Sequence, residues 1–268
     1  MVLFCIYYSS AEWRILQDTI MSNQKPTVWI TNRLDIADNI YSIHLSFPEI
    51  IEYPEYEDLN RKEEADNLTE EERSKLEYTR NNYINIIMKY GNFKKIDLLP
   101  DSMWSVLLDP VIAKGKVMNV PNPEDSIFAV RDGFILVTKP CAEILQRFRL
   151  SDTQMAPLQL FNPKTRELVN EETYYLLNIY AWRTYFDGKN NEIFINKNYK
   201  DYGYNIYTPP YNIKNGDCVL CSAALQCDVD LWHDPSVRGS IFLSQALRDA
   251  LHKARMLKTW FLHSCKLI

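Results

Sequence analysis

Three cysteines and a histidine in the last quarter of the chain have the side-chain types of a structural zinc site. Cys218 and Cys221 are separated by two residues, and Cys227 and His233 follow. A structural zinc ion needs four such ligands closing a tetrahedron. The sequence offers no second closely spaced pair, and the Val-Leu pair between the first two cysteines suits a core strand. We therefore expect no metal or other cofactor, although the sequence alone leaves metal binding by Cys218, Cys221 and Cys227 open.

His233 is the centre of the arrangement that could best support catalysis. It lies beside Asp230 and Asp234, either of which could orient it as a general base. The sequence has no nucleophile elbow, zinc-protease helix, P-loop or dinucleotide-binding fingerprint. We therefore predict a non-enzymatic protein, and the alternative is a small cytoplasmic enzyme with a pocket centred on His233.

The composition favours a globular, cytoplasmic protein over a nucleic-acid binder or a membrane protein. The 268 residues are 46% hydrophobic, which is enough for a sizeable core. The formal charge of −5 argues against nucleic acid as a partner and favours a basic one. No apolar run reaches the roughly 20 residues that span a bilayer, and the first residues lack a basic leader. The six cysteines are expected to be reduced.

Residues 49–78 carry most of the negative charge. They contain twelve acidic and four basic side chains, a net charge of −8, which leaves +3 for the rest of the chain. Thr69 and Glu72 have the spacing of a capping box, in which each side chain bonds the other residue's amide. The pattern predicts a helix from there to about Tyr90, with Gly91 as its stop. Its acidic side chains form either a solvated face or a surface for a cationic partner.

A strand–helix unit occurs twice in the second half of the chain. Residues 134–138 and 240–244 are short apolar strands that end in a hydroxyl residue, Thr138 or Ser244, able to cap a helix. Apolar residues then recur at helical spacing, and β-like segments follow at residues 157–161 and 259–262. We predict an α+β fold with two pseudo-related strand–helix–strand units, mixed or antiparallel sheets and a variable N-terminal α/β region.

The predicted organisation places a variable region with the acidic segment and long helix at residues 1–126 and the α+β domain at residues 127–268. The two could also form one continuous fold. Between the repeat units, residues 171–185 are expected to form a buried strand or helix, and residues 187–217 to form hairpins and loop. A short β-like run at residues 27–31 is one of several in the N-terminal region.

Residues 172–179 read Glu-Thr-Tyr-Tyr-Leu-Leu-Asn-Ile. They resemble the YYLLN segment characteristic of the immunity protein 11 family, which is found beside polymorphic bacterial toxins. The order of the flanking strands and helices is also similar, so that the resemblance covers about residues 127–263. One departure is Lys258, where the family commonly has a glycine between its last helix and a terminal strand.

The resemblance implies a cytoplasmic, non-enzymatic protein of bacterial competition. Such a protein binds a cognate toxin, a secretion-system effector encoded nearby, and neutralises it by occluding the active site. The resemblance carries over no catalytic residues. It also implies that Tyr174, Leu176 and Leu177 belong to the core and do not mark a binding surface.

The candidate toxin-binding residues lie in the acidic stretch. The alternation of Glu and Tyr between residues 52 and 57 favours an exposed, extended segment that a partner could grip. Acidic side chains would orient the partner, and aromatic side chains would supply affinity. The candidate set is Glu52, Tyr53, Glu55, Tyr56, Glu57, Asp58, Glu63 and Glu64. Residues 187–217 are a competing surface, and a scaffolding module, including a homodimer, is a third interpretation.

Overall fold

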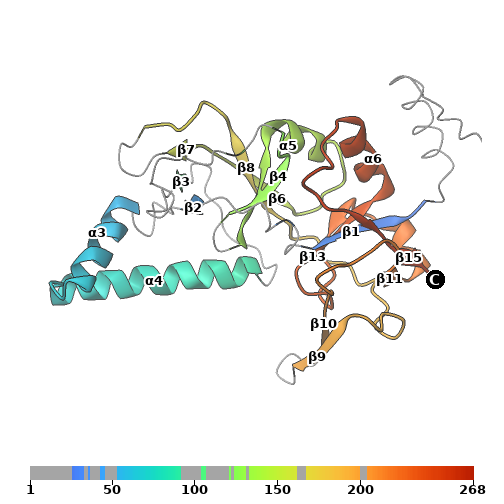
Figure 1. Ribbon diagram of the computed structural model, residues 1–268, viewed down its shortest axis with the longest axis horizontal. Helices are drawn as coiled ribbons and strands as arrows, with labels where there is room; N and C mark the ends of the chain where they lie inside the picture. Colours follow the sequence, from blue (N-terminus) through green and yellow to red (C-terminus); the bar gives the residue numbers. More distant parts are fainter. Residues whose placement is uncertain are drawn as a thin grey trace, which may run out of the picture.

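The computed structural model describes residues 26–32, 36, 43–45, 53–91, 104–106, 121, 124–130, 133–161, 167–199 and 204–268. Within them α-helices combine with several antiparallel sheets, which confirms the predicted α+β fold (Figure 1). The α-helices are α3 (Tyr53–Glu64), α4 (Glu70–Gly91), α5 (Lys139–Leu145) and α6 (Gln245–Lys253), and a 3-10 helix spans Ser222–Gln226.

The first repeat unit forms a four-stranded antiparallel sheet. Its strands lie in the order β4 (Ile127–Ala129), β5 (Ile135–Thr138), β8 (Tyr174–Asn178) and β6 (Gln154–Leu158). The YYLLN segment is β8, so a buried strand is confirmed for this part of residues 171–185. Helix α5 follows β5 directly, because Thr138 ends the strand and also precedes the first helical residue.

The second unit forms a separate four-stranded sheet of the same arrangement, and one of its strands comes from the N-terminal region. Its order is β12 (Leu231–Trp232), β13 (Ser240–Ser244), β1 (Val28–Asn32) and β14 (His263–Ser264), all antiparallel. Strand β1 takes the place that β8 has in the first sheet. The registers agree, since Tyr174 lies opposite Thr138 and Val28 lies opposite Ser244. The fold of residues 127–268 therefore includes a central strand from the first 126 residues.

The two hydroxyl residues that precede the helices differ in capping. Ser244 caps α6, because its Oγ accepts a hydrogen bond from the Leu247 amide at 3.2 Å. Thr138 takes the predicted N-cap position of α5 with the same extended backbone, but its side chain makes no capping hydrogen bond. Pro140 in the first turn has no N–H and removes one of the amides that a cap would serve.

Each sheet also bonds to the loop that follows the helix of the other unit. The Ser126 hydroxyl, just before β4, donates to the Met256 carbonyl oxygen at 2.6 Å. Asp230, just before β12, accepts from the Arg149 amide at 3.0 Å, while its own amide donates to the Arg149 carbonyl at 2.8 Å. In both cases the residue before the first strand of one unit is hydrogen-bonded to the loop after the helix of the other unit.

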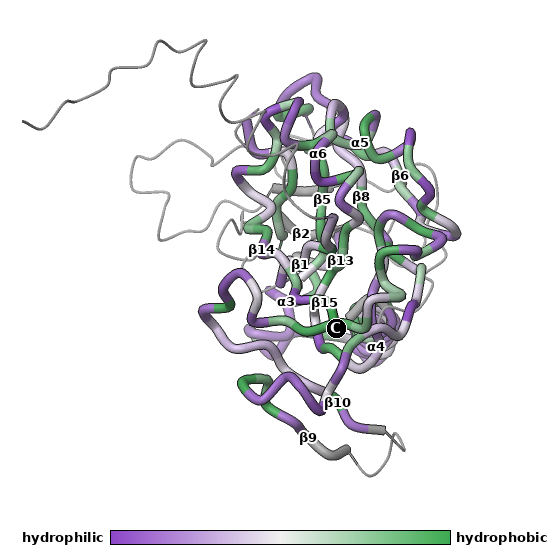
Figure 2. The backbone as a smooth tube through the Cα atoms, turned by 90° about the vertical axis from the view of Figure 1, so that its right-hand side faces the viewer, coloured by the Kyte–Doolittle hydropathy of each residue, from purple (hydrophilic) through white to green (hydrophobic). Residues whose placement is uncertain are grey.

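The two units share one hydrophobic core. Ile127 and Val137 of the first sheet lie in the same buried cluster as Leu231 and Leu243 of the second. Helices α5 and α6 lie side by side over this cluster (Figure 1), and the central strands β5 and β13 are mostly hydrophobic (Figure 2). Because each unit buries its apolar face against the other, the two units form one body.

The strand predicted at residues 259–262 is wrong. Thr259 and Trp260 lie in a turn, Phe261 and Leu262 have no regular secondary structure, and β14 begins at His263. Phe261 has a left-handed φ of 47°, which a continuous strand does not accommodate. Trp260 is fully buried in the shared core, so the apolar run reflects how the turn packs. In the first unit residues 157–161 do lie in β-structure, within β6 and β7 (Leu160–Phe161).

Three smaller sheets surround the shared core. A hairpin of β9 (Ile195–Tyr199) and β10 (Tyr204–Thr208) confirms the hairpin predicted within residues 187–217. Of the others, one pairs β11 (Val219–Leu220) with β15 (Lys266–Leu267), and one places β3 (Trp104–Val106) between β2 (Ile43–Leu45) and β7. Among the described helices, none combines the length and the apolar character needed to cross a bilayer.

Helices α3 and α4 form a hairpin that we call the arm, residues 53–91. Side chains near the end of α4, Tyr83, Ile86 and Ile87, pack against the first sheet, on the face that carries Phe128 and Leu136. From there α4 runs outward to the turn that joins it to α3 (Figure 1). The predicted helix from Thr69 is confirmed, and it ends at Gly91 as expected.

Candidate functional site

The segment predicted to be extended is a helix. Helix α3 begins at Tyr53, and Pro54 fits its first turn because amides there have no partner within the helix. Tyr56 and Leu59, three residues apart, pack in one cluster with Leu76 of α4. This helical spacing decides the structure, whereas the alternation of Glu and Tyr was too short to do so.

The structure places the eight candidate residues unequally. Glu52 lies outside the described residues, and of Tyr53 and Glu57 only the helical backbone is described. Tyr56 is half-buried inside the arm and is not free to act as an anchor for a partner. The candidates with described, solvent-facing carboxylates are Glu55, Asp58, Glu63 and Glu64.

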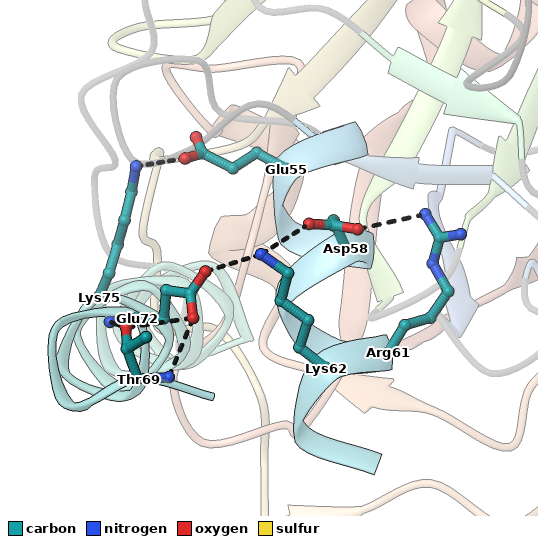
Figure 3. A network of polar contacts seen from close by, with 7 residues as sticks. All are labelled: Glu55, Asp58, Arg61, Lys62, Thr69, Glu72 and Lys75. Carbon is teal, nitrogen blue, oxygen red and sulfur yellow. Dashed lines mark hydrogen bonds and ion pairs between the residues drawn. The ribbon is translucent and has the colours of Figure 1, made fainter. Parts of the chain in front are cut away.

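Most of these carboxylates are already engaged within the arm (Figure 3). Glu55 pairs with Lys75, and Asp58 pairs with Lys62 at 3.4 Å. Outside the view of Figure 3, Glu63 receives two hydrogen bonds from the Arg80 guanidinium, at 2.6 and 3.0 Å. Two of these three pairs, Glu55–Lys75 and Glu63–Arg80, connect α3 to α4, so these acids hold the arm together and offer less free charge to a partner.

Glu72 of α4 accepts hydrogen bonds from both helix α3 and the N-terminus of its own helix. Its carboxylate accepts hydrogen bonds from the Lys62 ammonium at 2.7 Å and from the Thr69 amide at 3.0 Å, and its own amide donates to the Thr69 hydroxyl at 3.2 Å. This confirms the predicted capping box. The hydrogen bonds from Lys62 and Thr69 stabilise the charged form and lower the pKa of Glu72 from 4.5 to about 2.

Replacing Glu72 with Gln is expected to weaken the arm at neutral pH and to matter less in acid. Because the folded-state pKa is lowered, the stabilising effect of the carboxylate is present above pH 4.5 and is lost as the pH falls toward about 2. Urea unfolding followed by circular dichroism at pH 7, 4 and 2.5 measures this. Glu77→Gln on the outer side of α4 is the control, and a difference between Glu72→Gln and wild type that stays constant with pH would contradict the assignment.

The acids without such pairing lie at the tip of the arm and along α4. The arm has ten acidic and six basic side chains, a net charge of −4. Within the described part of the chain no ion pair is formed by Glu64, Asp66, Glu70, Glu71 or Glu77. Among the predicted residues whose side chains the structure describes, Glu64 therefore carries the charge most available to a partner.

Sequence reasoning missed three exposed apolar residues of α4. Tyr78, Ile84 and Met88 expose 65%, 50% and 58% of their surface, which is unusual for side chains of this size. On the inward side of the same helix, Leu76 packs on α3 and Ile87 packs on the first sheet. Applying the same helical spacing to the remaining apolar residues would have placed Ile84 and Met88 together on the other side.

The candidate cysteine ligands lie in and beside one hydrophobic cluster. Cys218 and Cys227 are buried in a hydrophobic cluster with Cys265, and Cys221 is half-buried. In the described ranges of the chain, no three His, Cys, Asp or Glu side chains gather as a metal ion would require. The cysteines thus take positions that small hydrophobic residues could also fill.

The residues of the alternative catalytic centre are engaged with the backbone. His233 is buried, and its Nδ1 lies 2.6 Å from the Ser240 carbonyl oxygen. Asp234 accepts hydrogen bonds from the amides of Tyr185 and Phe186, at 2.7 and 2.9 Å. Asp230 bonds to Arg149 of the other repeat unit. Each of these side chains therefore has a role in holding segments together.

Comparison with known proteins adds no relative. No protein-family model matches the chain, and no curated protein sequence matches it. The resemblance to the immunity protein 11 family stays a prediction, and the surfaces of the chain itself are the basis for the functional proposal.

Proposed function

We propose that the protein is an immunity protein that binds a cognate antibacterial toxin and neutralises it by occluding the toxin's active site. The observation that carries the proposal is the arm, a two-helix projection with a net charge of −4. Many antibacterial toxins act on nucleic acid or nucleotides and have a basic cleft for these substrates. An acidic helical projection is suited to such a cleft, because complementary charge speeds association and selects the partner.

The position of the YYLLN segment supports the same proposal. Tyr174, Leu176 and Leu177 are buried in the first sheet, as expected for residues that define the fold. The arm extends from this sheet through Tyr83, Ile86 and Ile87 of α4. A folded body that carries an acidic projection is suited to a protein that binds a toxin through the projection.

Titration calorimetry against the product of the adjacent gene, in a catalytically inactive form, tests the proposal. We expect nanomolar affinity. In stopped-flow measurements we expect an association rate that falls as salt is added, because salt screens the charges that steer the partners together. Co-expression should protect cells from the active toxin. Absence of binding would contradict the proposal, and protection without a complex would favour the alternative of an enzyme centred on His233.

A further inference from the structure

We infer that the arm contacts its partner through the outer face of α4, with Ile84 and Met88 as the apolar contact and Glu70, Glu71 and Glu77 as the charged rim. The partner that fits this face is a basic protein surface with an apolar recess. The inference rests on the proposed function and specifies where the toxin is held. It moves the interface from the acids of α3 to the opposite side of the arm.

The outer face of α4 is a continuous stripe of exposed residues. Its members follow one another at spacings of four and three residues, which places them on one side of a helix. They are Glu70, Ser74, Glu77, Asn81, Ile84 and Met88, and all are exposed. From first to last they extend over about 27 Å of helix, which is long enough to form one side of a standard protein interface.

The inward side of α4 is already covered. Leu76 packs on α3, and Tyr83, Ile86 and Ile87 pack on the first sheet. Ile84 and Met88 lie one turn apart among the exposed residues of the helix. Their exposure therefore does not follow from the packing of the arm, whereas a partner with an apolar recess would bury them. The unbranched Met88 can adapt its shape to such a recess.

The charges of this face select a basic partner over a second copy of the chain. Glu70, Glu71 and Glu77 form no ion pairs with other described residues. Arg73 lies toward α3, where its charge helps to lower the pKa of Glu63 after the larger effect of Arg80. A dimer through this face would bring two arms of net charge −4 together, and like charges across an interface oppose association.

The test compares two double variants with wild type in calorimetry and stopped-flow binding to the inactive toxin. Ile84→Ala with Met88→Ala is expected to raise Kd by about 10- to 100-fold, mainly through faster dissociation. Glu70→Gln with Glu77→Gln is expected to slow association several-fold and to weaken its salt dependence. Alanine and glutamine are good helix formers, so circular dichroism should show the arm intact. Leu225→Ala, at an exposed leucine of the 3-10 helix, is the matched control and should leave Kd unchanged.

The possible outcomes separate this inference from the proposed function. If wild type binds and the Ile84→Ala, Met88→Ala variant binds equally well, the toxin is held elsewhere and the inference is overturned while the function stands. If wild type does not bind the toxin, both are overturned. If sedimentation shows a wild-type dimer that this variant dissociates, a second copy occupies the face and the inference is overturned.

Discussion

Replacing Ile30 with Ala is expected to lower the free energy of unfolding by about 2–5 kcal/mol, which is the usual range for emptying a buried aliphatic site. Ile30 is fully buried at the centre of β1, opposite Phe242 of β13 and His263 of β14. Urea denaturation measures the loss. Leu176→Ala should cause a similar loss, because Leu176 has the same position in the first sheet.

Ile195→Ala is the control for this prediction. Ile195 is 57% exposed on β9, and we expect its replacement to change the unfolding free energy by less than about 0.5 kcal/mol. A chain of residues 127–268 alone is also expected not to fold, since β13 and β14 would lose the strand between them. Stable folding of that fragment, or a neutral Ile30→Ala, would show that β1 is dispensable.

The elements that could be predicted from the sequence are those determined by nearby residues. The capping box of Thr69 and Glu72 and the helix behind it depend on contacts within one turn. The two strand–helix units also have local patterns, and both appear in the structure. Local patterns suffice in these cases because the hydrogen bonds and apolar stripes involved span only a few residues.

The pairing of the strands could not be predicted in the same way. The sequence indicated a β-like run at residues 27–31, but nothing nearby shows that β1 lies between β13 and β14, far along the chain. The equivalence of β1 and β8 is seen only in the strand register. Val28 of β1 lies opposite Ser244, and Tyr174 of β8 lies opposite Thr138, the residues that precede α6 and α5. The first unit has β8 beside its central strand, and a search for the corresponding strand of the second unit would have suggested β1.

The candidate site shows why charge alone is a poor guide to a binding surface. Glu55 and Glu63 belong to the acidic stretch that is predicted to bind a partner. In the structure, however, Lys75 and Arg80 of α4 form ion pairs with them. Which acids stay unpaired depends on how α3 packs against α4, and that packing follows from Leu59 and Leu76. The same geometry exposes Ile84 and Met88, because it fixes which side of α4 faces away.

Replacing Asp234 with Ala is expected to destabilise the protein by about 3 kcal/mol, because buried amides that lose their acceptor each cost roughly 1–3 kcal/mol. The carboxylate is buried and accepts from the amides of Tyr185 and Phe186 and, at 3.0 Å, from that of Ser236. It thus fastens the segment after β8 to the segment after β12. Chemical denaturation followed by tryptophan fluorescence measures the loss.

Asp228→Ala is the matched control, since Asp228 is an exposed acid just before β12 whose ion pair with Arg183 should contribute little. The contrast between the two aspartates also bears on the alternative function. An Asp234 that orients His233 for catalysis would be replaceable without much loss of stability, whereas one that satisfies buried amides would not. Unchanged stability in Asp234→Ala would therefore favour a catalytic role for this carboxylate. A large loss of stability would show that the carboxylate holds the segments beside the second sheet together.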